Sequence, residues 1–361
     1  MTELGVEDAL TVVRRTWPDE QVTGHDLLDG SDRTVVARVR TSERSVVVKL
    51  HRSIGFPESL VREPAALSVV REGLELLGVS TEPPGVLLGD LGTGTDVATA
   101  LLGDDPDAAV DGIRAWAEAL GRLQAANRDE SSFGAALTEH AARLGQRVPA
   151  VDAMPEYLAT TADRLAALAP ELGVVPTERA LEELRGLDGL LGGQVRALTP
   201  SDACPDNNLW TSDGLVLLDF EGAQVRHVAW DAAYLRVPWP SCWCCWRLPQ
   251  ECADRGLQAW KDAFADPYVL SASFAQDLDI AHLGWVLTSA GLFLRNALDG
   301  VPQTPEEAAV MPAQRVMLQH RLLTAPVVDR LPALALFVTE LAEATQRAWA
   351  AEPLALAPSF R

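Results

Sequence analysis

Lysine is nearly absent from this sequence of 361 residues, which contains only Lys49 and Lys261. Positive charge as a whole is scarce, because 30 lysines and arginines stand against 51 acidic residues and give a formal net charge of −21. Such a chain repels nucleic acids and anionic membranes at physiological salt, so we expect neither as a partner. The acidity has two open explanations, the solubility of the whole protein or a cationic substrate.

Long hydrophobic runs are also missing. No stretch of about eighteen apolar residues is present, and the acidic residues 1–4 lack the basic and apolar regions of a signal peptide. Five cysteines cannot all pair, and four of them lie between Cys242 and Cys252, which argues against the disulfide framework of a secreted protein. Apolar residues nevertheless make up 48% of the chain, enough for a sizeable core. These features predict a soluble, cytoplasmic, globular protein of unassigned oligomeric state.

The order of secondary structure changes near residue 91. Before it, apolar spacing predicts a helix over 6–17, then strands over 27–39 and 45–50. After it, long helical patterns dominate, and we expect a helical bundle that includes one continuous helix over 305–324. We therefore divide the chain into residues 1–91 and 92–361.

The densest set of chemically useful polar residues lies in residues 200–221. Asp202 and Asn207 are five positions apart, and a hairpin turn predicted at 212–214 returns the chain so that Asp219 lies beside them. Carboxylate and amide oxygens are hard ligands suited to Mg²⁺ that also binds phosphates. A carboxylate kept apart from the metal can accept a hydroxyl proton.

Lys49 stands out because the chain otherwise avoids lysine, and it lies in a β-branched strand. A helix is predicted to follow over 59–70, with Pro64 in its first turn and Glu63 near its start. Glu63 either pairs with Lys49 or stabilises the helix N-terminus. The two residues together favour the ion pair.

Five polar residues in this order resemble the aminoglycoside phosphotransferases, which are small-molecule kinases with a protein-kinase-like fold. They are Lys49, Glu63, Asp202, Asn207 and Asp219. The spacing Asp-x-x-x-x-Asn followed by Asp219-Phe220-Glu221 matches the kinase catalytic loop and its metal-binding Asp. Glu221, where protein kinases have Gly, favours the small-molecule kinases. The resemblance covers about residues 25–240.

The resemblance implies an α/β (α+β) two-lobe fold, with a small mainly β N-terminal lobe, a large helical C-terminal lobe, and ATP between them. Asp202 would be the catalytic base, and Lys49 braced by Glu63 would orient the ATP phosphates. Asn207 and Asp219 would hold Mg²⁺. We expect transfer of the γ-phosphoryl group to a hydroxyl of a small molecule such as an antibiotic, a sugar or an amino alcohol.

Further contacts with ATP are expected in the N-terminal lobe. Backbone N–H groups at Gly30 and Ser31 either approach the phosphates or form a plain turn. Backbone groups from Leu88 to Leu91 either read the adenine edge or belong to a linker. Asp231 would cap the following helix and brace the catalytic loop through backbone N–H groups.

The loop departs from its relatives, which usually have His-Gly-Asp and His-Pro-Gly-Asn where this chain has residues 200–202 and 204–207. The alternative is thus a catalytically impaired, kinase-like, nucleotide-binding regulatory protein, against which the intact Asp202 and Asp219 argue. A segment rich in Trp and Cys, residues 239–246, has three interpretations: a packed aromatic loop near the substrate cleft, a stacking surface for a substrate ring, or a metal site.

Overall fold

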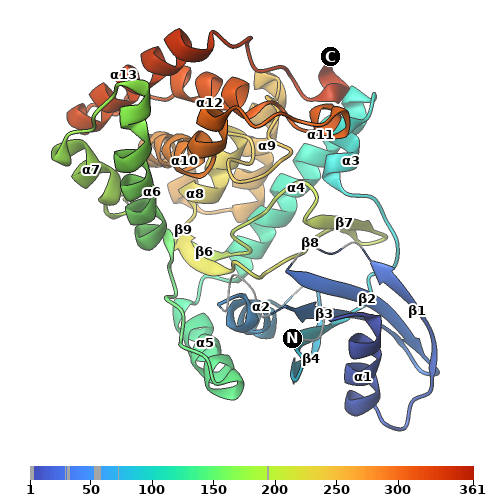
Figure 1. The fold of residues 1–361 in the computed structure, drawn as a ribbon. Helices are drawn as coiled ribbons and strands as arrows, with labels where there is room; N and C mark the ends of the chain where they lie inside the picture. Colours follow the sequence, from blue (N-terminus) through green and yellow to red (C-terminus); the bar gives the residue numbers. More distant parts are fainter. Residues whose placement is uncertain (1–3, 29, 31–32, 53–57, 72, 193–194) are drawn as a thin grey trace.

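The computed structural model describes residues 4–28, 30, 33–52, 58–71, 73–192 and 195–361. One part of the molecule is built on a five-stranded sheet, and the other is mainly helical (Figure 1). The predicted fold class, a small mainly β N-terminal lobe and a large helical C-terminal lobe, is confirmed.

The N-terminal lobe contains an antiparallel sheet with the strand order β1-β2-β3-β5-β4. Its strands are β1 (Val22–Leu28), β2 (Thr34–Thr41), β3 (Ser45–His51), β4 (Leu76–Thr81) and β5 (Pro84–Gly89). β2 and β3 are rich in β-branched residues, which suit a pleated, half-buried surface. Helix α1 (Val6–Thr16) packs on these two strands with its apolar side. The central strand β3 carries Lys49, which lies between Val36 of β2 and Val86 of β5.

Helix α2 (Ser59–Val69) is buried along most of its length. Pro64 is its sixth residue, so the prediction that Pro64 lies in the first turn is wrong. A proline here leaves the Leu60 carbonyl without its helical donor, and the burial of α2 against the sheet and α5 outweighs that loss. Glu63 is consequently one turn inside the helix.

Helix α5 (Glu130–Leu144) lies beside α2, although it follows the sheet in sequence (Figure 1). Val61 and Ala65 of α2 share a core with Phe133 and Leu137 of α5. A segment after residue 91 therefore packs on the N-terminal lobe, and the division at residue 91 stays a prediction.

The rest of the chain forms the helical lobe. Its helices are α3 (Val97–Leu102), α4 (Pro106–Ala126), α6 (Met154–Leu168), α7 (Glu178–Arg185), α8 (Ala229–Ala232), α9 (Gln250–Phe264), α10 (Ala272–Asp299), α11 (Pro305–Val310), α12 (Gln314–Leu323) and α13 (Pro332–Trp349). The single helix predicted over 305–324 is wrong, because the chain breaks between α11 and α12 at a segment containing Pro312. None of the helices that the structure describes is long and apolar enough to cross a bilayer.

Two short antiparallel pairs lie between the lobes (Figure 1). β6 (Arg196–Thr199) pairs with β9 (Gln224–His227), and β7 (Asn208–Thr211) pairs with β8 (Gly214–Leu217). The hairpin predicted at 212–214 is thereby confirmed, since Thr211 lies opposite Gly214. Short 3-10 helices complete the fold at Ala169–Leu172, Asp188–Leu190, Ala233–Leu235, Pro267–Leu270 and Pro358–Phe360.

His282 on α10 makes the stability of the protein sensitive to acid. Burial, followed by the positive charges of Arg236 and Arg321, lowers the pKa of His282 to about 4. In the unfolded chain a histidine takes up its proton near pH 6.5, so stability is retained above that pH and is lost as pH falls toward 4. We expect wild type to lose about 1–2 kcal/mol more than His282→Gln between about pH 7.5 and about pH 5, in urea denaturation. The same change at the exposed His25 should leave the pH dependence as in wild type.

Candidate active site

Lys49 lies at the centre of a carboxylate cluster that joins the two lobes. Its Nζ atom is 3.0 Å from Glu63 Oε1 and 2.5 Å from Asp219 Oδ1. The predicted ion pair with Glu63 is therefore present. The contact with Asp219 joins residues 170 positions apart in the chain, so the same ammonium group also meets the predicted metal ligand.

The charges in this cluster stabilise one another. Burial alone would lower the pKa of Lys49, but the negative charges of Glu63 and Asp219 outweigh it and raise the pKa. Burial raises the pKa of Glu63, whereas the Lys49 charge and a hydrogen bond to His51 bring it down to about 2. His51 Nε2 lies 3.2 Å from Glu63 Oε2 and is a second brace that sequence reasoning missed. Its position two residues after Lys49 on the same strand face was the available signal.

Asn207 closes the loop between β6 and β7, residues 200–207, which carries the candidate base Asp202 and is called the catalytic loop below. Its side-chain nitrogen donates to the backbone oxygen of Asp202 over 2.8 Å. Its backbone oxygen accepts from Leu218 N over 2.9 Å, which holds the loop against the chain that leads into Asp219. The loop with Asp202 and Asn207 therefore lies beside the segment that leads into Asp219, and the convergence of the three side chains on one ion stays a prediction.

Asp202 carries the candidate catalytic carboxylate. As a residue it is exposed to solvent, while other protein atoms crowd its carboxyl group, and Ser241 Oγ donates to its Oδ1 over 3.3 Å. Burial, followed by the negative charges of Asp219 and Asp206, raises the pKa of Asp202 to about 6. A carboxylate with a pKa nearer neutrality is a stronger base than an ordinary aspartate, so this environment suits proton acceptance.

Two residues of the site adopt the left-handed backbone region, which non-glycine residues rarely occupy: Ser201 at φ 73° and Asp219 at φ 58°. Contacts hold Ser201 in place, since its carbonyl accepts from Arg226 Nη2 over 3.1 Å and from Tyr234 Oη over 2.8 Å. Its N–H donates to Thr199 Oγ1 over 3.0 Å. The fold therefore imposes the conformation that orients the neighbouring Asp202.

Asp231 supports the loop by a different route from the one predicted. Its buried carboxylate accepts from Thr199 Oγ1 over 2.9 Å, Gln124 Nε2 over 2.8 Å and Arg226 Nη2 over 2.6 Å. The predicted helix cap is wrong, because the N-cap residue of α8 is Val228 and Asp231 is already in the first turn. Thr199 and Arg226 relay the support to Ser201, in place of direct bonds from Asp231 to loop N–H groups.

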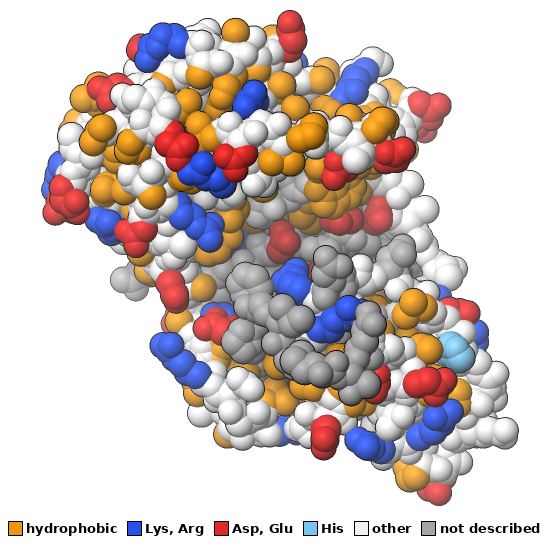
Figure 2. All heavy atoms as spheres, viewed as in Figure 1, with side chains coloured by type: hydrophobic (Ala, Val, Ile, Leu, Met, Phe, Trp, Pro, Cys, Tyr) orange, Lys and Arg blue, Asp and Glu red, His pale blue; other side chains and the backbone are white. Residues whose placement is uncertain are grey.

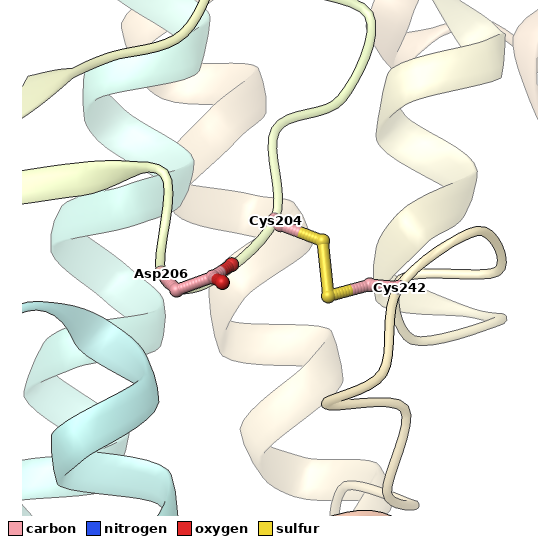
Figure 3. Close-up of side chains that lie close together, drawn as sticks. All are labelled: Cys204, Asp206 and Cys242. Carbon is pink, nitrogen blue, oxygen red and sulfur yellow. A yellow bond between two sulfur atoms is a disulfide. The ribbon is translucent and has the colours of Figure 1, made fainter. Parts of the chain in front are cut away.

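The structure adds loop contacts that sequence reasoning missed. Asn208 Oδ1 accepts from Val97 N over 3.1 Å, and Asn208 Nδ2 donates to Pro205 O over 2.7 Å, which ties the loop to α3. Cys204 forms a disulfide with Cys242, from the Trp- and Cys-rich segment (Figure 3). That segment therefore lies beside the catalytic loop, and which of its three interpretations holds stays open. The chain has one disulfide without being a disulfide framework. The distance of 38 residues between the two cysteines gave no sequence signal for the pairing.

The contacts with ATP predicted at Gly30, Ser31, Leu88 and Leu91 have different outcomes in the structure. Gly30 is exposed beside Thr34, and Ser31 lies outside the described residues. Leu88 belongs to β5, whose two edges pair with β3 and β4, and its side chain is buried in the core. Its backbone groups are therefore not free to read a base. Leu91 lies after the sheet and lines a cavity of about 430 Å³ together with Phe220 and residues of α4 and the β7–β8 hairpin.

The residues present fit a magnesium ion. The side-chain oxygen of Asn207 accepts no hydrogen bond from the residues that the structure describes, and the Asp219 side chain is 32% exposed. Both offer the hard oxygen atoms that Mg²⁺ prefers. Glu221 adds a third carboxylate, 3.9 Å from Lys49 Nζ and 2.9 Å from Arg33. Figure 2 shows a recess in the surface between the two lobes, with acidic side chains along it.

Comparison with known families agrees with the geometry of this site. The profile of the Phosphotransferase enzyme family matches residues 24–270, which is more than half of the chain. The chain belongs to this family. The resemblance inferred from five polar residues is therefore confirmed, and a small-molecule phosphotransferase is the class of enzyme to which the chain is assigned.

Solved structures show the same fold in distant relatives. An ethanolamine kinase of Plasmodium vivax is 12% identical, with a TM-score of 0.53, over 88% of this chain and 84% of that one. A choline kinase of Cryptosporidium parvum is 10% identical, with a TM-score of 0.53, over 94% and 99% of the two chains. A choline/ethanolamine kinase family protein of Mesorhizobium loti is 13% identical, with a TM-score of 0.50, over 89% and 93%. No curated protein sequence matches the chain.

Proposed function

We propose that the protein transfers the γ-phosphoryl group of ATP to a hydroxyl group of a small molecule, with Mg²⁺ as cofactor. The observation that carries the proposal is the contact between Lys49 and Asp219, which brings a cation of one lobe and a carboxylate of the other together near Asp202. Family membership supports the same reaction class.

Each residue has a role that follows from its position. Lys49, held by Glu63, would bind phosphate oxygens, and Asp202 would accept the hydroxyl proton. Asn207 and Asp219 would hold Mg²⁺, which neutralises charge on the phosphates when bound. These residues contribute positioning and charge stabilisation, which supply most of the rate in phosphoryl transfer.

The acceptor can be sought among the substrates in the relatives' names and the small hydroxyl compounds that the sequence resemblance implies. We propose a panel of ethanolamine, choline, an aminoglycoside and a sugar, each with ATP or GTP and Mg²⁺, with release of the nucleoside diphosphate as the readout. Release above the rate in the absence of acceptor supports a kinase. Nucleotide binding without transfer to any acceptor would instead support the regulatory alternative, which the altered loop from Pro200 to Asp206 favours.

Asp219→Asn should remove the dependence of ATP binding on Mg²⁺. The amide keeps the shape of the side chain but lacks the negative charge that attracts the metal. We therefore expect the factor by which Mg²⁺ increases ATP affinity to be smaller than in wild type by roughly tenfold or more. Calorimetry with and without Mg²⁺ measures this. Asp213→Asn, in the exposed turn of the same hairpin, is the matched control. An unchanged Mg²⁺ effect in Asp219→Asn would remove Asp219 from the metal site.

A further inference from the structure

The Cys204–Cys242 disulfide joins the catalytic loop to residues 238–246. These comprise Pro238 and the Trp- and Cys-rich residues 239–246, and they are named the Trp segment below. Cys204 lies two residues after Asp202, and its Cα atom is 6.1 Å from the Cα atom of Cys242 (Figure 3). Both cysteines are only 4% exposed. The covalent bond therefore lies within the candidate active site, next to its catalytic carboxylate.

The Trp segment also contacts the catalytic loop on both sides of this bond. Ser241 Oγ donates to Asp202 Oδ1 over 3.3 Å, and Trp243 Nε1 donates to Asp206 Oδ2 over 2.9 Å. These two hydrogen bonds and the disulfide form within three consecutive residues of the segment. Each fixes a different point of the loop that carries Asp202.

The other end of the segment is anchored in the helical lobe. Arg321 of α12 donates to the backbone oxygens of Pro238 and Pro240, over 2.8 and 3.2 Å. Ser289 of α10 donates to Pro240 O over 2.9 Å. The segment thus connects α10 and α12 of the helical lobe to the loop that carries Asp202.

The carboxylate of Asp206 lies close to both sulfur atoms of the disulfide. Its Oδ1 is buried and has no hydrogen-bond partner among the described residues, and its carboxylate lies within 4.8 Å of both sulfur atoms. A disulfide cannot donate to this oxygen, whereas a thiol can, although weakly. Reduction would therefore supply Asp206 with a donor that the disulfide form lacks.

We propose that Cys204 and Cys242 are a reversible thiol–disulfide pair that positions the catalytic loop. A small dithiol reduces the pair: its thiolate attacks one sulfur, the S–S bond breaks, and after a second exchange the dithiol leaves as its cyclic disulfide while both cysteines become thiols. The disulfide form fixes the Trp segment against Asp202 and Asp206. The reduced form keeps the hydrogen bonds but loses the covalent link, so the loop opens more often.

The first test needs no catalytic activity. Alkylation of the denatured, unreduced protein should label three thiols, Cys244, Cys245 and Cys252, and peptide mapping should find Cys204 linked to Cys242. After dithiothreitol treatment, backbone hydrogen exchange in residues 200–209 and 238–249 should rise by about tenfold or more, while β2 and β3 stay unchanged. Reoxidation by a small disulfide such as glutathione disulfide, which is itself reduced to two thiols as the Cys204–Cys242 bond re-forms, should restore the slow exchange. Free thiols at both positions in air-equilibrated protein, a bound divalent metal in place of the bond, or unchanged exchange would overturn the proposal.

Variants separate this positioning role from general stability. Cys204→Ala and Cys242→Ala should each reproduce the exchange of the reduced protein and abolish its response to dithiothreitol, and the double variant should add nothing further. Cys252→Ala, at another buried thiol, should respond as wild type does. The effect on turnover rests on the proposed function: reduction should raise KM for the acceptor while ATP affinity stays constant. Turnover absent from every form would count against the proposed function, while the exchange data would still decide the role of the cysteines.

Discussion

Asp202→Asn should slow phosphoryl transfer by about 10²-fold or more, the usual cost of losing a general base. The asparagine keeps the shape of the side chain and an oxygen that can accept from Ser241 Oγ, but it cannot take a proton. ATP and Mg²⁺ binding should survive, because Lys49, Asn207 and Asp219 are unchanged. Single-turnover transfer to an acceptor from the panel, at saturating ATP and Mg²⁺, measures the effect.

The size of this effect depends on when the proton moves. In a loose, metaphosphate-like transition state the base acts late, so a decrease at the lower end of the range is consistent with the assignment. Asp213→Asn controls for the loss of one negative charge, because this exposed residue lies in the turn of the β7–β8 hairpin, at the end away from the loop. A wild-type rate in Asp202→Asn would leave the protein without an identified base and would favour the regulatory alternative.

The residues that could be predicted are those whose chemistry departs from the local pattern. Lys49 is one of two lysines and lies in an apolar strand, and Asp219 lies two residues after another apolar strand, which follows a clear turn signal. Strand alternation and a short hairpin fix position over a few residues, so both sites were within reach of sequence reasoning. The same reasoning could not predict the strand order around Lys49, because strand order depends on contacts between distant segments.

The residues that could not be predicted act through distant partners. Asp231 was read as a helix cap because local sequence suggests local bonds, yet its carboxylate accepts from Gln124, 107 residues away. Leu88 was read as a base contact because β4 was not recognised, and pairing with β4 uses the second edge of β5. The placement of α5 against α2 and the pairing of Cys204 with Cys242 likewise depend on tertiary packing. In each case the missing information was which segment lies opposite.

Asp231→Ala should cost about 3–5 kcal/mol of unfolding free energy, the range for breaking a buried ion pair from one side. Arg226 and Asp231 are 1% and 0% exposed, so the variant would leave the guanidinium charge buried without its carboxylate. Thr199 and Gln124 would lose their acceptor in the same step, which adds unsatisfied donors. Because Arg226 and Thr199 hold Ser201, the change should also loosen the catalytic loop.

Urea denaturation measures this effect, and two further variants identify its cause. Glu343→Ala removes one side of the exposed Glu343–Arg347 pair on α13, and it should cost no more than about 0.5 kcal/mol. Arg226→Met combined with Asp231→Ala removes both charges, so the double variant should be less destabilised than the sum of the two single variants. If the two costs simply added, the destabilisation would come from lost packing and not from an unpaired buried charge, and Arg226 would not depend on Asp231 to hold the loop.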